Sequence, residues 1–384
     1  GVPLSAFKDS FKILKQFELT AIKYLECLVD TTTIATKNRP ASAFAQLETL
    51  NIEYMDGFEA LCKGQPPQGF LRNLKHLEVF ACSKFQAADE LFHNREENQE
   101  HPLSNLQSLV LHELPELRWI FKGSPHSFTL QSLKVVNIDR CRKLKSLFPP
   151  SLIQSLVLLE ELKIRGCQEL VTLFADGEIE SKTSSRPLCF PKLKTLRINV
   201  CSKLEYVVPV TLAQALPALA LLSVSYCDEL KQVFGMPNEQ DRVQPLDSLL
   251  LPSLQDLELI WLRNLTSFAP QNYVVKAPSL KRLEAYGCSR VMNLPIQQAN
   301  NQMQLTLGGV ELSAFKEMLC NSKDHILKDF EDHKNLVPNL VDLEHLDGLI
   351  SLSINSWRGG ECLIGTTQAI MDFKCNDSQN FENC

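Results

Sequence analysis

Residues 130–174 read LQSLKVVNIDRCRKLKSLFPPSLIQSLVLLEELKIRGCQELVTLF and contain one pattern twice. The pattern places aliphatic residues at its first, fourth and sixth positions, a cysteine at the ninth and a leucine at the twelfth. It recurs further along, because Cys201 and Cys227 lie 60 residues after Cys141 and Cys167. The connector recurs as well, since LFPPSLIQSL at 147–156 matches VVPVTLAQAL at 207–216. Regular internal repetition of this kind indicates a solenoid.

The spacing is typical of a leucine-rich repeat, in which each repeat supplies one short strand at its L-x-L segment. We therefore predict an α/β solenoid, a leucine-rich-repeat horseshoe with a parallel concave sheet and an irregular or short-helical convex side. Single helical turns are expected after the prolines of the two connectors. The residue at the cysteine position marks each repeat, and the markers are Met55, Cys82, Leu114, Cys141, Cys167, Cys201, Cys227, Leu262 and Cys288.

Three regions are expected along the chain. Residues 1–40 are the end of a preceding repeat block, 41–295 are regular repeats, and 296–384 are degenerate repeats that start a second super-repeat. The evidence is that GVELSAFK at 309–316 echoes GVPLSAFK at 1–8, and ECLIGTT at 361–367 echoes ECLVDTT at 26–32. A further repeat is predicted around Leu352 and Ile354, no register is predicted for about 295–345, and the chain is expected to be a fragment. Polar loops are expected at 93–102, 176–187 and 236–245.

The composition favours a folded protein in a reducing compartment. The net charge of −6 argues against a nucleic-acid partner, and no apolar run is long enough to span a membrane. Six of the 13 cysteines share one repeat position, where they are expected to form a column of reduced, buried thiols that face the backbone. Such usage suits an intracellular, cytoplasmic location.

No motif for catalysis or for a cofactor is found. The sequence contains no phosphate-binding glycine loop, no C-x-x-C pair and no G-x-S-x-G segment. His325 and His333 could form a metal cluster with the nearby acidic residues, but a solvated helix face is the favoured interpretation. These acidic residues are Asp324, Asp329, Glu331 and Asp332. We therefore expect no enzyme activity and no cofactor or metal site in this segment.

The expected concave face suggests where a protein partner would bind. Arginines and aromatic residues flank the strand leucines, and these residue types anchor protein interfaces. The alternative is that the aromatic rings stack laterally and that the arginines pair with Asp139 or Glu161. The predicted partner-binding residues are Phe80, Arg140, Arg165, Arg197, Tyr226, Trp261 and Tyr286.

Segments 26–32 (ECLVDTT), 47–85 (LETLNIEYMDGFEALCKGQPPQGFLRNLKHLEVFACSKF) and 133–174 resemble the C-terminal leucine-rich repeats of plant intracellular disease-resistance proteins. The most similar group is the coiled-coil class with a nucleotide-binding domain. The resemblance implies a cytosolic immune receptor whose repeats sense a pathogen effector or a guarded host protein and hold the nucleotide-binding domain inactive. ADP or ATP is implied only for that domain, whose motifs this sequence lacks.

Two other classes were compared with the repeats. The substrate-recognition repeats of a ubiquitin-ligase adaptor also carry cysteines, but they continue with an I-T-D-x-G-[LI] segment where this chain has CRKLKSLF and CQELVTLF. An adaptor remains the alternative function. An extracellular receptor would show regular 24-residue repeats and paired cysteine caps, whereas the steps here vary between 26 and 35 residues.

Overall fold

The computed structural model describes residues 13–32, 44–64, 66–67, 69–86, 103–120, 130–153, 155–173, 190–210, 212, 216–236, 247–270, 273–288, 304–308, 324–327 and 351–354. The chain divides into two units, Gly1–Thr195 with Val200–Lys203, and Leu196–Asn199 with Leu204–Cys384. The polar loops predicted at 93–102, 176–187 and 236–245 lie outside the described residues, apart from Met236. The predicted division at residues 40 and 295 stays a prediction.

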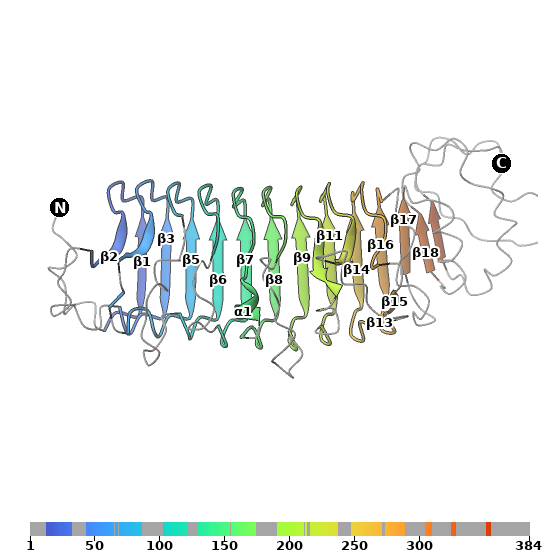
Figure 1. Ribbon diagram of the computed structural model, residues 1–384, viewed down its shortest axis with the longest axis horizontal. Helices are drawn as coiled ribbons and strands as arrows, with labels where there is room; N and C mark the ends of the chain where they lie inside the picture. Colours follow the sequence, from blue (N-terminus) through green and yellow to red (C-terminus); the bar gives the residue numbers. More distant parts are fainter. Residues whose placement is uncertain are drawn as a thin grey trace, which may run out of the picture. The chain divides into compact units, whose positions relative to one another are not determined.

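Six described strands of the first unit pair in parallel in one sheet, side by side in chain order (Figure 1). Each residue lies opposite its counterpart in the next repeat, so that Leu50 is between Phe17 and Leu77. The same register continues to the last strand of the unit. These strands are β1 (Gln16–Thr20), β3 (Thr49–Glu53), β5 (His76–Phe80), β6 (Ser108–His112), β7 (Val135–Asp139) and β8 (Glu161–Arg165).

The second unit repeats this arrangement, with strands that again follow one another in chain order. Thr195, the first residue of β9, is assigned to the first unit. The strands are β9 (Thr195–Asn199), β11 (Leu221–Ser225), β14 (Asp256–Ile260), β16 (Arg282–Tyr286), β17 (Gln304–Gly308), β18 (Asp324–Leu327) and β19 (Ser351–Ile354).

The last three strands test two predictions, a repeat around Leu352 and a helix around His325. Strand β19 contains Leu352 and Ile354, which confirms the strand predicted there. Strands β17 and β18 lie in the stretch for which no register was predicted. The helix interpretation is wrong at 324–327, because His325 lies in a strand and is paired with Leu305 of the preceding repeat. Its counterpart His333 is outside the described residues.

The strands form because their side chains alternate between two environments. In β3 the second and fourth residues, Leu50 and Ile52, have no exposed surface, while the first, third and fifth are half-buried. The same alternation recurs in β5, β6, β7, β14 and β16. Successive residues of a strand point to opposite faces, so each L-x-L segment turns its aliphatic side chains into the core. The parallel sheet of a leucine-rich-repeat solenoid is thereby confirmed.

The marker residue of each repeat begins a tight turn. The carbonyl of Cys141 accepts a hydrogen bond from the amide of Leu144 at 3.1 Å, and the carbonyl of Cys167 accepts one from Leu170 at 3.2 Å. The C-x-x-L spacing is therefore the spacing of a turn that ends by returning a leucine to the core. All nine predicted markers are fully buried.

The cysteine markers form the expected column. The Cys82 thiol lies 3.4 Å from the carbonyl oxygen of Phe80, and the Cys227 thiol lies 3.4 Å from that of Ser225. The eight cysteines among the described residues are free thiols. A thiol is a weak donor, so each bond adds little energy, but it satisfies a carbonyl at the strand end without a bulky side chain.

The return segments are mostly irregular, with short regular pieces. The predicted helical turn in the first connector is confirmed as α1 (Pro150–Ile153). Three two-stranded parallel ladders were not predicted, and they join β2 (Cys27–Asp30) to β4 (Ala60–Lys63), β10 (Tyr206–Pro209) to β12 (Gln232–Gly235), and β13 (Asp247–Leu250) to β15 (Tyr273–Lys276). Within the described ranges, no helix is long and apolar enough to cross a membrane.

Aromatic rings stack between repeats beneath the sheet. Phe58 and Phe85 are parallel with centroids 5.9 Å apart, and Phe234 and Phe268 meet edge to face at 5.3 Å. Stacking of this kind contributes about 0.5–1.5 kcal/mol per pair beyond the burial of the rings. Each repeat therefore gains stability from its neighbours, as expected of a solenoid.

Candidate functional site

Each unit presents the half-exposed side chains of its strands on one surface, which we call the open face. It consists of the first, third and fifth residues of each described strand whose side chains are described, because the second and fourth are buried. Neighbouring repeats are in register, so residues of the same position lie side by side across the strands. Side chains from different repeats can thus contact one partner together.

The open face is bordered by a second line of residues, which we call the left-handed row. Each member directly follows a strand and has a positive φ, between 50° and 66°. The amide of Tyr54 donates to the carbonyl of Phe80 at 3.0 Å, and that of Arg140 to the carbonyl of Arg165 at 2.8 Å, so the backbone is bonded to the next repeat. The row consists of Ala21, Tyr54, Ala81, Glu113, Arg140, Gly166, Val200, Tyr226, Trp261 and Gly287.

This row was not predicted. Left-handed backbone is strained for residues with a Cβ, and it costs about 1–2 kcal/mol. Glycine avoids that cost, and glycine occupies the row at Gly166 and Gly287. These two glycines were the signal in the sequence. Their lack of a Cβ also makes room, because a Cβ at Gly287 would lie 2.7 Å from the ring of Trp261, the preceding member of the row.

The seven predicted partner-binding residues fall at three different positions. Phe80, Arg165 and Tyr286 are fifth residues of strands, and Arg197 is a third residue. The remaining three, Arg140, Tyr226 and Trp261, belong to the left-handed row. Phe80, Arg140 and Arg165 lie in the first unit and the others in the second.

In the first unit, an aromatic ladder runs across neighbouring strands. Tyr54 meets Phe80 edge to face with centroids 5.0 Å apart, and Phe80 meets His112 at 6.2 Å. The ring of His112 then contacts the side-chain amide of Asn137 at 3.3 Å. The lateral stacking weighed as an alternative is therefore present, and yet Tyr54 keeps 54% of its surface exposed.

The two arginines of the first unit differ in their surroundings. Arg140 forms an ion pair with Glu113, the preceding member of the left-handed row, rather than with Asp139 or Glu161. Glu161 pairs with Lys163 of its own strand. Arg165 is exposed, and no described residue forms an ion pair with it, although it lies opposite Asp139 in the register. Arg165 therefore remains available to an outside carboxylate.

In the second unit, the aromatic residues gather at the end of β14 and β16. Trp261 and Tyr286 meet edge to face at 5.0 Å, and the Arg263 guanidinium lies 6.0 Å from the Trp261 ring. Tyr226, one repeat earlier in the row, is 48% exposed. Aromatic rings held in this way lose little side-chain freedom on binding, which favours them as anchors.

An ionic network crosses the open face of the same unit. Arg282 donates to Asp256 at 2.9 Å and to Glu258 at 2.5 Å, and Glu284 lies 3.7 Å away. The hydrogen bond to Asp256 is the main cause that raises the pKa of the Arg282 guanidinium. Arg197 approaches the nearly buried Glu258 at 3.7 Å. The carboxylates on this open face are thus largely paired with arginines.

Three thiols of the column are poor nucleophiles. Burial raises the pKa of the Cys82 thiol to about 11 and the pKa of the Cys141 and Cys288 thiols to about 12. Thiols with such pKa values stay protonated at neutral pH and do not attack electrophiles. Among the residues that the structure describes, no group of three or more His, Cys, Asp or Glu side chains could hold a metal ion.

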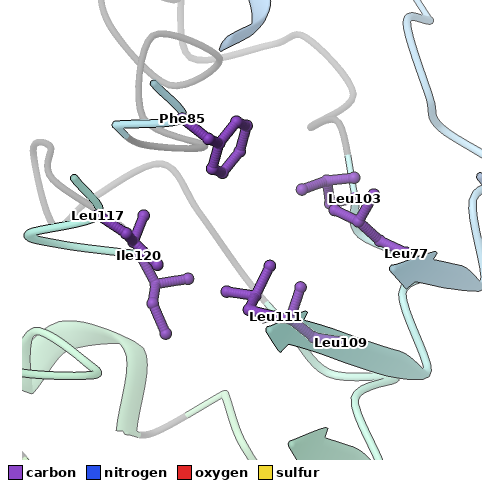
Figure 2. Close-up of a pocket in the computed structure, with 7 residues that line it drawn as sticks. All are labelled: Leu77, Phe85, Leu103, Leu109, Leu111, Leu117 and Ile120. Atoms are coloured by element: carbon purple, nitrogen blue, oxygen red, sulfur yellow. The ribbon is translucent and has the colours of Figure 1, made fainter. Parts of the chain in front are cut away.

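A small cavity lies inside the first unit, between the repeats of β5 and β6. Figure 2 shows seven side chains pointing into it, with Phe85 across from Leu109 and Leu111. All seven are aliphatic or aromatic, so they present no polar group to orient a substrate. The lining residues are Leu77, Phe85, Leu103, Leu109, Leu111, Leu117 and Ile120. We interpret the cavity as imperfect packing where two repeats meet.

Comparison with known proteins agrees with this geometry. A family model described as plant disease resistance protein RPS2-like, leucine-rich repeats, matches residues 5–168 and 176–307. A search of curated proteins found no match. Repeats of this kind generally serve as protein-interaction modules rather than as catalysts. The match covers most of the residues that form the sheets, and the chain therefore belongs to the RPS2-like family of plant disease resistance proteins and carries their leucine-rich repeats.

Proposed function

We propose that these repeats recognise a protein, either a pathogen effector or a host protein that the receptor guards, and that they help to hold a nucleotide-binding domain of the same receptor inactive. The observation that carries the proposal is the open face together with the left-handed row. Both present arginine and aromatic side chains on a rigid sheet, and these are the residue types that dominate the energetics of protein interfaces.

Two residues illustrate why binding there is favourable. Arg165 is exposed and has no described ion-pair partner, so an incoming carboxylate would not have to displace an existing contact. Tyr226 is about half exposed in a left-handed conformation. Covering such side chains removes apolar surface from water and adds charge-assisted hydrogen bonds. A ligand that binds the repeats better when they are released from the nucleotide-binding domain would shift the receptor toward its active state.

A cytoplasmic location and the absence of a cofactor in this segment belong to the same proposal. The support for the location is the thiol column, because buried free cysteines suit a reducing compartment. ADP or ATP would be bound by the nucleotide-binding domain and not by the repeats.

The test is co-precipitation of the chain with the nucleotide-binding domain of the same receptor in reducing extract. The chain is compared with the double variant Arg165→Ala, Trp261→Ala, which should retain its circular dichroism spectrum and lose most of the bound domain. Equal binding by a folded double variant would show that these residues are not the contact surface. Absence of binding by both would favour a sensor of ligands only or a ubiquitin-ligase adaptor.

A further inference from the structure

Three carboxylates gather on the open face of β1, β3 and β5 in the first unit. Glu18 is the third residue of β1 and Glu78 the third residue of β5, and in the register both lie beside Asn51 of the strand between them. Glu53 is the fifth residue of that middle strand, beside Phe80. Neighbouring strands are about 4.8 Å apart, so the Cα atoms of the three glutamates lie within about 10 Å of one another.

These carboxylates are not neutralised within the described structure. None of them forms an ion pair or a hydrogen bond with a described residue, and the described open face of β1, β3 and β5 contains no lysine or arginine. Lys15 and Lys75, which directly precede β1 and β5, are engaged elsewhere, because both pair with Glu48, at 3.3 Å and 2.7 Å. On the open face of the second unit, by contrast, Arg282 neutralises the carboxylates around it.

An exposed aromatic pair borders the same carboxylates. Tyr54 follows Glu53 directly and meets Phe80 edge to face. Its φ of 53° is a conformation that residues with a Cβ adopt at a cost in stability, whereas two other repeats have glycine at this place in the row. A half-exposed tyrosine therefore occupies a position where glycine would cause no strain.

We infer that Glu18, Glu53, Glu78, Tyr54 and Phe80 form an acidic aromatic patch that binds an arginine- or lysine-bearing segment of the protein partner. A guanidinium can make two kinds of contact with such a patch, because it pairs with carboxylates and stacks on aromatic rings. The same charge repels nucleic acid and anionic membrane surfaces. The inference rests on the proposed function, and it specifies the chemistry of the partner at one end of the first unit.

The test uses the full chain and a fluorescent peptide of about ten residues in which arginine and serine alternate, with binding measured by fluorescence anisotropy at low salt. The double variant Glu53→Gln, Glu78→Gln should bind the peptide about fivefold more weakly or worse, since each exposed ion pair is worth about a factor of two to five. The matched control is Glu205→Gln, Glu229→Gln, which removes the same charge from two exposed glutamates of the second unit that form no ion pair with a described residue. This control should stay within about twofold of the unaltered chain.

A second variant, Tyr54→Gly, separates binding from folding. It removes the aromatic ring and the backbone strain together, so its urea midpoint should not fall greatly while its peptide affinity falls several-fold. Equal weakening by both glutamate double variants would overturn the inference, because bulk charge would then explain the binding. Unchanged affinity in Tyr54→Gly would also overturn it. If the chain does not bind the arginine peptide, the patch is refuted. The proposed function still stands in that case if the Arg165→Ala, Trp261→Ala variant no longer co-precipitates with the nucleotide-binding domain.

Discussion

Alkaline pH should destabilise this protein through its buried thiols. A free cysteine titrates at about 8.5 in an unfolded chain, whereas burial raises the pKa of Cys141 and Cys288 to about 12. Below the unfolded value both states keep the proton, so the free energy of unfolding does not change with pH through these groups. Above it the unfolded chain loses the proton and the folded one keeps it. The thiols therefore contribute stability that is fully present at neutral pH and is lost as the pH rises toward 12.

The size of the effect follows from the slope of this linkage. Each such thiol lowers the free energy of unfolding by about 1.4 kcal/mol per pH unit, which amounts to about 2 kcal/mol between its unfolded pKa and about pH 10. The contribution of one thiol can be isolated with Cys141→Ala, because every other titration cancels when the variant is compared with the unaltered chain at each pH. The stability cost of Cys141→Ala should be smaller by about 2 kcal/mol at about pH 10 than at about pH 7.5.

The assay is urea unfolding in reducing buffer, followed by circular dichroism at both pH values. Leu114→Met is the matched control, since Leu114 occupies the same buried position in another repeat and does not titrate. Its cost should be below about 1.5 kcal/mol and equal at the two pH values. A cost of Cys141→Ala that is likewise independent of pH would refute the reasoning, because the buried thiol would then titrate in the folded protein as it does in the unfolded chain.

Two further substitutions test the geometry directly by their urea midpoints. Gly287→Ala should cost about 2–3 kcal/mol, because the new Cβ would clash with the Trp261 ring and the backbone φ is unfavourable for alanine. Gly69→Ala should cost only about 1 kcal/mol, since the nearest side-chain atom to its new Cβ is 3.5 Å away. Equal costs would mean that the Trp261 ring moves freely. Glu258→Gln should cost about 1–3 kcal/mol by weakening its charge-assisted hydrogen bond to Arg282 and its ion pair with Arg197. Glu284→Gln should cost less, because Glu284 lies 3.7 Å from its arginine, and the reverse order would contradict the ionic network.

The strands and the cysteine column could be predicted because both have a signature in side-chain chemistry. Alternation of aliphatic residues identifies a strand, and a small residue before a turn leucine identifies the column. The left-handed row could not be found in the same way, because a backbone angle selects no side chain except glycine. Tyr54 and Val200 both occupy it with side chains that the conformation disfavours. The ladders of the return segments were missed because β2, β4, β13 and β15 lie outside the leucine and cysteine pattern by which the repeats are recognised.

The three arginines predicted to bind a partner show how surface positions follow from the sequence. Arg140, Arg165 and Arg197 were grouped because they lie on consecutive repeats, but they precede their marker cysteines by one, two and four residues. The structure gives each offset a different location. The residue directly before the marker belongs to the left-handed row. The residue two before the marker is the fifth of the strand, the residue four before it is the third, and the residue six before it is the first. The register keeps each position side by side across the described strands that pair within a unit. Side chains reinforce one another when their offsets match, as Glu18 and Glu78 do, and not merely when their repeats are adjacent. The surface of such repeats is therefore best described as separate columns, one for each strand position. In this protein the column of third positions carries Glu18 on β1 and Glu78 on β5. This acidic stretch favours a cationic segment of the partner.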